Sequence, residues 1–176
     1  MARIAVIGIG NVLTADDGVG PYVLKTLEAG WTFPEDVQLL DAGTPGLDLT
    51  AYMADLEAVV FVDAVKASAP PGTLRLYDRD GLVKKSPVLA VSPHEPGVRE
   101  AIMNAEFMGV APKVIRLVGV VPGSTGYEMG LTDAVRAAVP AAVAQVLEEL
   151  RALGVQPQPR VPPLEPDLWW ERKPGA

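Results

Sequence analysis

Short runs of branched apolar residues alternate with longer amphipathic segments along most of this chain. Five runs have the composition of strands, and they lie at residues 3–7, 37–40, 58–65, 73–77 and 114–121. Four segments have apolar side chains at helical spacing, and they lie at residues 18–30, 43–56, 96–108 and 132–153. Pro140 should kink the last helix or split it in two. Strands that alternate with helices predict an α/β fold with helices on both faces of a sheet.

The length of 176 residues fits a single domain. We expect that domain to occupy residues 1–154, because the last helical pattern ends there and Gly154 suits a helix C-terminus. Residues 155–176 hold six of the 17 prolines and show no periodic pattern, which predicts an extended, proline-rich C-terminal tail. Trp169 and Trp170 in this tail would dock either on the domain or on a partner.

Composition excludes several classes of function. The formal net charge of −7 disfavours binding to nucleic acid, because an acidic chain repels phosphate. The absence of cysteine removes disulfides, thiolate metal sites and cysteine nucleophiles, and it fits a reducing, cytoplasmic compartment. The apolar N-terminal stretch is too short to span a bilayer and shows no signal-peptide cleavage pattern. We therefore expect a cytoplasmic protein with no membrane partner, and a monomer is the default for a small acidic domain.

Three potential metal ligands fall where the predicted strands end. Asp17 follows the first strand, Asp63 lies near the end of the third, and His94, the sole histidine, follows the fourth. Ligands of open α/β sheets bind beyond the carboxyl ends of the strands, so these side chains can converge on one crevice. Two carboxylates and an imidazole would suit nickel, zinc or iron, and three ligands leave positions open for a substrate.

Each candidate also has a structural interpretation. His94 can be a loop histidine that is satisfied by the backbone. Asp16 and Asp17 can cap the helix that follows them, and Asp41 can do the same for the next helix. Asp63 is harder to explain in this way, because a carboxylate in a buried strand is unfavourable unless it is paired, hydrogen-bonded or bound to a metal.

The glycine loop at residues 8–13 partly matches a dinucleotide-binding fingerprint. Gly8 and Gly10 fit the pattern, and Asp41 could stand for the ribose-binding acid, but Leu13 occupies the place of the third glycine. A nucleotide-dependent enzyme therefore stays open as a minor alternative. The sequence contains neither an H-E-x-x-H zinc motif nor a G-x-S-x-G serine motif.

Several motifs taken together resemble the hydrogenase maturation endopeptidases. These motifs are GIGNVLTADDGVG at 8–20, DAGTPGLDL at 41–49, FVDAV at 61–65, SPHEPG at 92–97, GVVP at 119–122 and GLT at 130–132. The resemblance covers about residues 3–153. It implies a twisted, five-stranded, mostly parallel sheet. It also implies that Asp17, Asp63 and His94 form the catalytic and metal-binding site; relatives often have glutamate at the first position.

The resemblance further implies an endopeptidase that removes the C-terminal extension of a nickel-iron hydrogenase large-subunit precursor after nickel insertion. The partner would be the nickel-loaded precursor, which supplies the nickel itself. The attacking group would be a water molecule activated by an aspartate or by the metal. A chaperone that checks for nickel without cutting is the main alternative. This interpretation requires the three side chains to meet at one place that faces solvent.

Overall fold

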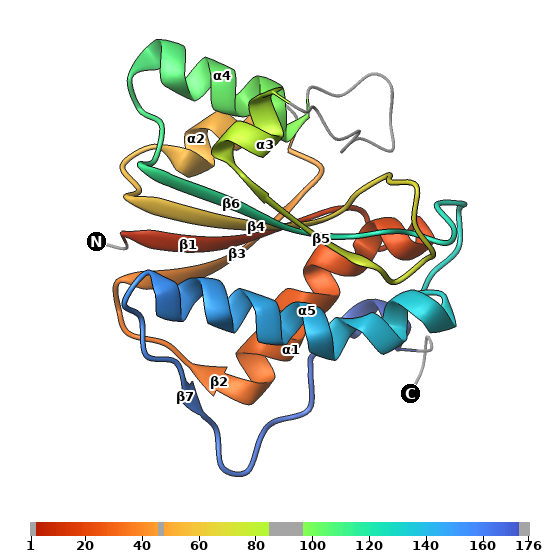
Figure 1. Cartoon of the computed structure of the whole chain (residues 1–176). Helices are drawn as coiled ribbons and strands as arrows, with labels where there is room; N and C mark the ends of the chain where they lie inside the picture. Colours follow the sequence, from red (N-terminus) through yellow and green to blue (C-terminus); the bar gives the residue numbers. More distant parts are fainter. Residues whose placement is uncertain (1–2, 46–47, 85–96, 173–176) are drawn as a thin grey trace.

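A five-stranded sheet lies between two layers of helices (Figure 1). The structure is a computed structural model that describes residues 3–45, 48–84 and 97–172. The strands follow the order β3-β1-β4-β6-β5 across the sheet. The four parallel strands are β3 (Val37–Gly43), β1 (Ile4–Ile9), β4 (Ala58–Ala64) and β6 (Val114–Val120), and β5 (Leu74–Asp78) runs antiparallel to β6. This arrangement confirms the α/β class and the mostly parallel five-stranded sheet.

The strands β1 and β4 form the centre of the sheet and are buried along their whole length. They pair directly, with Val6 opposite Val60 and Ile7 opposite Phe61. A central strand that is covered on both faces needs apolar side chains in both directions, which explains why these two runs show no polar alternation. Asp63 interrupts this pattern near the end of β4.

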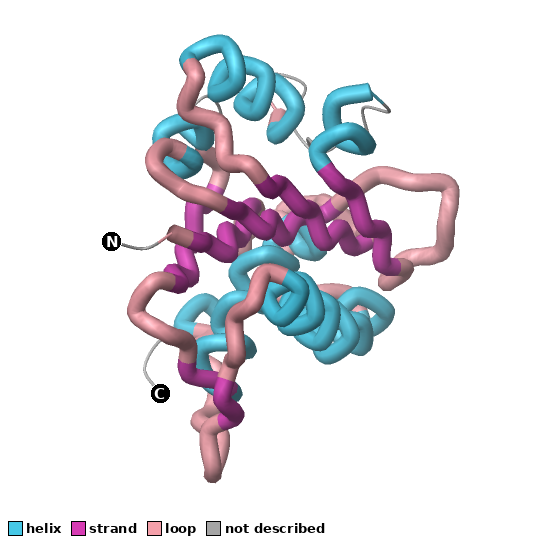
Figure 2. The backbone as a smooth tube through the Cα atoms, turned by 60° about the vertical axis from the view of Figure 1, so that its left-hand side comes forward, coloured by secondary structure: helices cyan, strands magenta, loops and turns pink. Residues whose placement is uncertain are grey.

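Helices cover both faces of the sheet, as Figures 1 and 2 show. The helices α1 (Val19–Gly30) and α5 (Asp133–Ala152) lie on one face. The helices α2 (Leu49–Met53), α3 (Arg79–Lys84) and α4 (Val98–Met108) lie on the other. Each layer closes its own apolar core: Val6, Leu24 and Val146 belong to one, and Ile7, Phe61 and Ile102 to the other.

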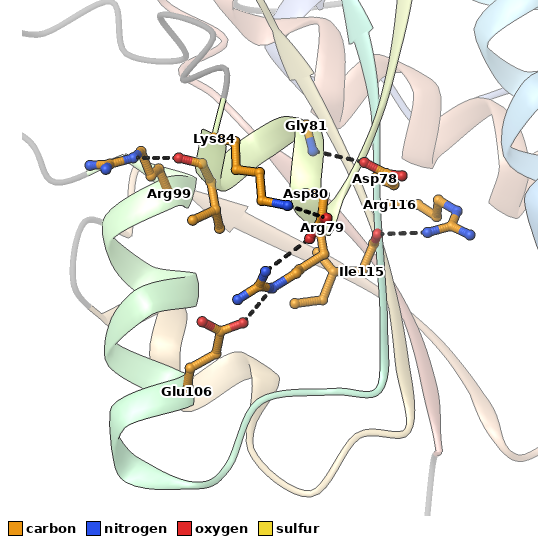
Figure 3. Close-up of polar contacts among 10 residues, drawn as sticks. Asp78, Arg79, Asp80, Gly81, Lys84, Arg99, Glu106, Ile115 and Arg116 are labelled. Atoms are coloured by element: carbon orange, nitrogen blue, oxygen red, sulfur yellow. Dashed lines mark hydrogen bonds and ion pairs between the residues drawn. The ribbon is translucent and has the colours of Figure 1, made fainter.

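Polar contacts hold α3 on α4 (Figure 3). Arg79 Nε donates to Glu106 Oε1 at 2.6 Å, and Arg99 Nε donates to the carbonyl oxygen of Val83 at 3.1 Å. The helix α4 begins on the side where the parallel strands end (Figure 1), so the bond between Arg99 and Val83 holds the end of α3 and the start of α4 near the carboxyl ends of those strands.

The helix α5 is continuous from Asp133 to Ala152, so Pro140 does not split it in two, and the kink that was the other expectation stays a prediction. Proline cannot donate the hydrogen bond that this position would make to the carbonyl four residues earlier. Pro140 is exposed, and the carbonyl that loses its partner can therefore bind water instead. The apolar stripe of Val139, Val143 and Val146 keeps both halves of the helix packed on the core.

The C-terminal tail returns to the domain instead of extending away from it. Its strand β7 (Gln158–Pro159) pairs antiparallel with β2 (Trp31–Thr32), directly after α1. The short 3-10 helix η3 (Trp169–Glu171) follows, and Trp170 is buried within the α1–α5 core. Trp169 is largely exposed. Of the two docking sites expected for these rings, Trp170 uses the domain itself.

Five short elements in the described part of the chain were not predicted from the sequence. They are α3, the β2 and β7 pair, the 3-10 helix η1 (Ala15–Gly18) inside a segment expected to be a loop, and the 3-10 helix η3 in the tail. Each is too short to show a period. The segment 43–56 was expected to hold a turn and then a helix, and its helix is only the five residues of α2, while β1 and β3 extend further than predicted, to Ile9 and Gly43. Residues 46, 47 and 96 of the predicted helices lie outside the described residues.

Within the described residues, every helix is too short or too polar to cross a bilayer.

Candidate active site

The order of the strands creates a crevice at the carboxyl ends of β1 and β4. The chain passes from β1 through α1 to β3 on one side, and then crosses to β4 on the other side of β1. The connections that follow β1 and β4 lead to opposite sides, so an opening remains between them at the carboxyl ends of these strands. Open α/β sheets bind ligands at such openings. Asp17 follows β1, and Asp63 is the sixth of the seven residues of β4.

Asp17 is held by the loop that precedes it. Its Oδ2 atom accepts hydrogen bonds from the backbone N–H of Asn11 at 2.9 Å and from the Thr14 hydroxyl at 3.2 Å. Gly10 has a φ of +132°, and a Cβ there would collide with the carbonyl oxygen of Asp17. The loop therefore depends on glycine for its close turn. Among the described residues, both donors end on Oδ2, which leaves Oδ1 available for a ligand.

Asp63 lies in a strongly apolar environment at the end of β4. Its Oδ1 atom accepts a hydrogen bond from the backbone N–H of Ala64 at 2.7 Å. Burial raises the pKa of Asp63 well above its usual value, and the charge of Asp17 raises that pKa further, while the Ala64 N–H opposes both effects. A buried carboxylate whose charge is destabilised by a neighbouring carboxylate has the electrostatics expected of a site that accepts a cation or a proton.

Asp17 and Asp63 lie near enough for the charge of Asp17 to act on Asp63. Both are buried, with 8% of Asp17 and 3% of Asp63 exposed, so the expectation that these two side chains face solvent is wrong. The third predicted ligand, His94, lies outside the described residues. Within those residues, no cluster of three or more Asp, Glu or His side chains could hold a metal ion. The three-ligand site therefore stays a prediction.

Asp16 has a different role from its neighbour Asp17. Its side chain is fully buried and accepts four hydrogen bonds, from the backbone N–H groups of Gly123, Ser124 and Thr132 and from the Thr132 hydroxyl, at 2.7 to 3.0 Å. A buried carboxylate with this many donors is well satisfied. Neither Asp16 nor Asp17 caps α1, as one interpretation of the sequence had it, because Gly18 occupies the N-cap position and no side chain makes a capping bond there. Asp16 fastens the segment after β6 to the segment after β1.

Asp41 stabilises its own turn and does not cap the second helix. Its Oδ1 atom accepts a hydrogen bond from the backbone N–H of Gly43 at 3.0 Å. The Gly43 carbonyl in turn accepts one from the Gly10 N–H at 2.7 Å. The residue before α2 is Asp48, whose side chain makes no capping bond either. The capping role that the sequence suggested for Asp41 is therefore wrong.

The geometry of the glycine loop disfavours the nucleotide alternative. A dinucleotide-binding loop offers free backbone N–H groups to a pyrophosphate. Here the N–H of Asn11 is already bonded to the Asp17 carboxylate, and Gly10 packs against the Asp17 backbone. Gly20 serves close packing of α1 on the sheet, because a Cβ there would lie 2.6 Å from the carbonyl oxygen of Val62. A phosphate would meet negative charge in this crevice.

Comparison with known proteins identifies the class of enzyme. The family model described as hydrogenase maturation protease matches residues 21–149. The chain belongs to this family. It is 36% identical over 159 residues to the hydrogenase 2 maturation protease of Escherichia coli K12, covering 90% of this chain and 96% of that one. It is 34% identical over 177 residues to the hydrogenase expression/formation protein HupD of Rhizobium leguminosarum, covering 97% and 88%.

Solved structures agree with this assignment. The E. coli hydrogenase maturating endopeptidase HybD superposes with a TM-score of 0.83 at 35% identity, over 91% of this chain and 99% of that one. A nickel-iron hydrogenase maturation protease from Thermococcus kodakarensis gives a TM-score of 0.63 at 28% identity, over 85% and 93%. This chain is therefore a peptidase that acts in hydrogenase maturation, and the non-cutting chaperone loses its support.

Sequence reasoning missed the residues that support the aspartates. Asn11 and Thr14 hold Asp17, and Thr132 holds Asp16. Asn11 and Thr14 lie within six residues of Asp17, so a local turn pattern could have suggested them. Thr132 is 116 residues from Asp16, and no local pattern connects the two.

Proposed function

We propose that this peptidase removes the C-terminal extension of a nickel-iron hydrogenase large-subunit precursor, and that it acts only after nickel has been inserted. The nickel belongs to the substrate. Asp17, Asp63 and His94 complete its coordination and bring one peptide bond of the precursor into a fixed position. The observation that carries this proposal is the buried pair of carboxylates at the carboxyl ends of β1 and β4.

The chemistry of the pair supports the role of nickel. Each carboxylate has one oxygen that receives no hydrogen bond from the described residues, Oδ1 of Asp17 and Oδ2 of Asp63. A cation between them would relieve the electrostatic cost that raises the pKa of Asp63. An imidazole from His94 would add a nitrogen ligand of the kind that nickel accepts.

Recognition of nickel would restrict cleavage to precursor molecules that already contain the metal. A precursor that lacks the metal offers no partner for the carboxylates, so its affinity is lower, and the difference between the two affinities sets the specificity. The same contacts would hold the scissile bond in place, which supplies much of the rate of a hydrolytic enzyme.

A water molecule is the attacking group that the described residues support best, because the chain has no cysteine and no serine motif. The water oxygen bonds to the carbonyl carbon, and one of its protons passes to a carboxylate. That proton then goes to the leaving amine as the peptide bond breaks. A monomeric, cytoplasmic enzyme is the context expected from the sequence, and both properties stay predictions.

The test is to incubate the protein with large-subunit precursor, either loaded with nickel or free of it, and to measure the mass of the precursor. We expect a shorter product from the nickel-loaded precursor only. An unchanged mass in both samples, beside an active relative, would contradict the processing role. Equal cleavage of both samples would keep the peptidase and remove nickel recognition.

A further inference from the structure

We propose that the loop between β6 and α5, residues 121–132, is a preformed docking surface for the precursor protein, with Tyr127 and Met129 as its contact residues. This inference rests on the proposed function, since it names the surface that the same substrate would cover. We call this segment the Asp16-anchored loop.

Asp16 and its neighbour hold this loop in one place. Besides the four bonds to its side chain, Asp16 donates its backbone N–H to the carbonyl of Ser124 at 3.1 Å. Ala15 donates its N–H to the carbonyl of Glu128 at 2.6 Å. Both ends and the middle of the loop are thus bonded to the two residues that precede Asp17. A surface fixed in this way loses little conformational entropy when a partner binds.

The loop presents large apolar side chains to solvent although its backbone is well anchored. Tyr127 is 96% exposed and Met129 is 61% exposed. Leu13, also exposed, lies two residues before Ala15 on the other side of the bond to Glu128. Tyrosine and methionine are enriched at protein interfaces, and tyrosine is frequent among the residues that carry binding energy.

The position of the loop selects the precursor as the occupant. A protein substrate that places a peptide bond beside Asp17 and Asp63 must also cover the chain around them, because a folded protein cannot approach one point alone. The Asp16-anchored loop is bonded to residues 15 and 16, so it lies within that covered area. We therefore expect apolar side chains of the precursor, close to the scissile bond, to contact Tyr127 and Met129.

A second exposed apolar pair provides a matched control. Phe107 is 91% exposed and Met108 is 60% exposed, at the end of α4. The helix α4 ends at Met108 and leads to the amino end of β6 (Figure 1), whereas Asp17 and Asp63 lie at the carboxyl ends of β1 and β4. Substitution of Phe107 and Met108 removes a comparable apolar surface from a place that the substrate does not cover.

The experiment compares the double variant Tyr127→Ala/Met129→Ala with Phe107→Ala/Met108→Ala. Binding of both pairs to nickel-loaded precursor is compared in the same Asp63→Asn background, which slows turnover and weakens the nickel contact equally in the two, and processing is measured with Asp63 intact. We expect the first pair to raise Kd and KM by roughly tenfold or more with kcat little changed, as for interface residues that carry binding energy. The control pair should leave all three values unchanged.

The outcomes separate the inference from the function on which it rests. Cleavage by the unsubstituted protein together with unchanged Kd in the Tyr127/Met129 variant would overturn the docking surface and keep the proposed function. No cleavage by the unsubstituted protein would contradict the proposed function. Binding then still decides the inference, which fails if the precursor does not bind or binds the variant equally well. A loss of kcat at unchanged Kd would also overturn it.

Discussion

Asp16 binds Thr132 twice, through the backbone N–H at 2.7 Å and through the side-chain hydroxyl at 2.8 Å. The backbone N–H groups of Gly123 and Ser124 donate the other two of the four hydrogen bonds that the buried Asp16 carboxylate accepts. The two bonds from Thr132 join the loop after β1 to the start of α5, and they fix the positions of the two segments relative to each other. Asp17, directly next to Asp16, is left to face Asp63.

Asp16→Ala should lower the free energy of unfolding by about 2 to 5 kcal/mol, because three backbone N–H groups and one hydroxyl lose their shared, fully buried acceptor. Urea unfolding followed by circular dichroism measures this change. Thr132→Val, which removes only the hydroxyl donor, should cost about 1 kcal/mol. A loss below about 1 kcal/mol for Asp16→Ala would show that water replaces the carboxylate.

Asp63→Asn should reduce processing by roughly 10²-fold or more while the fold persists. The amide cannot take the water proton and binds a cation poorly. The variant should unfold at the same temperature or a higher one, since it removes a buried charge that Asp17 destabilises. Mass spectrometry of the precursor and a thermal melt test the two parts separately. A marked drop in melting temperature would indicate that Asp63 stabilises the fold.

Gly20→Ala should destabilise the protein by about 3 kcal/mol or prevent folding. The new Cβ would collide with the backbones of β1 and β4, which cannot move apart without breaking the sheet. Gly30→Ala, at the other end of the same helix, meets nothing within 4 Å and should stabilise by up to about 1 kcal/mol. Chemical denaturation of both variants tests this contrast, and equal effects would contradict it.

Trp170→Ala should lower the free energy of unfolding by about 3 kcal/mol, because the ring is buried and packs edge-on against Tyr22, with centroids 5.1 Å apart. Trp169→Ala should cost much less, since that ring is largely exposed. Tryptophan fluorescence during urea unfolding reports both. Similar losses for the two variants would show that the tail docks differently.

Tyr22→Phe should change the response of stability to alkaline pH. Burial raises the pKa of Tyr22 above its usual value of about 10, and its hydrogen bond to Glu171 raises that pKa further. The folded state therefore binds the phenol proton more tightly than the unfolded state does. This contribution is complete below pH 10 and is lost as pH rises through the folded pKa. Denaturation from pH 8 to 11 should show a smaller decline in the variant.

The sequence was sufficient to predict the helices and strands that have a distinctive pattern of apolar residues. The runs that became β1 and β4 are uniformly apolar because both faces of these strands are covered, and that pattern is visible without coordinates. Asp63 was detectable for the same reason, as a carboxylate inside such a run. The antiparallel pairing of β2 with β7 was not, because two-residue strands have no pattern of their own.

The division of labour between Asp16 and Asp17 could not be predicted either. The two residues are chemically identical and adjacent in the chain, and both precede a helix. Their roles depend on which direction each side chain takes, and the turn at Gly10 and the donors near Thr132 set those directions. Such long-range pairing has no local signature.

The link between Asp16 and Thr132 also sets an order of events during synthesis. The two residues are 116 positions apart, so a nascent chain carries Asp16 without its partners until the start of α5 has left the ribosome. Until its donors are present, the Asp16 carboxylate stays hydrated, and the crevice at the carboxyl ends of β1 and β4 cannot reach its final structure. The newly made enzyme should therefore gain peptidase competence only after Thr132 has emerged from the ribosome.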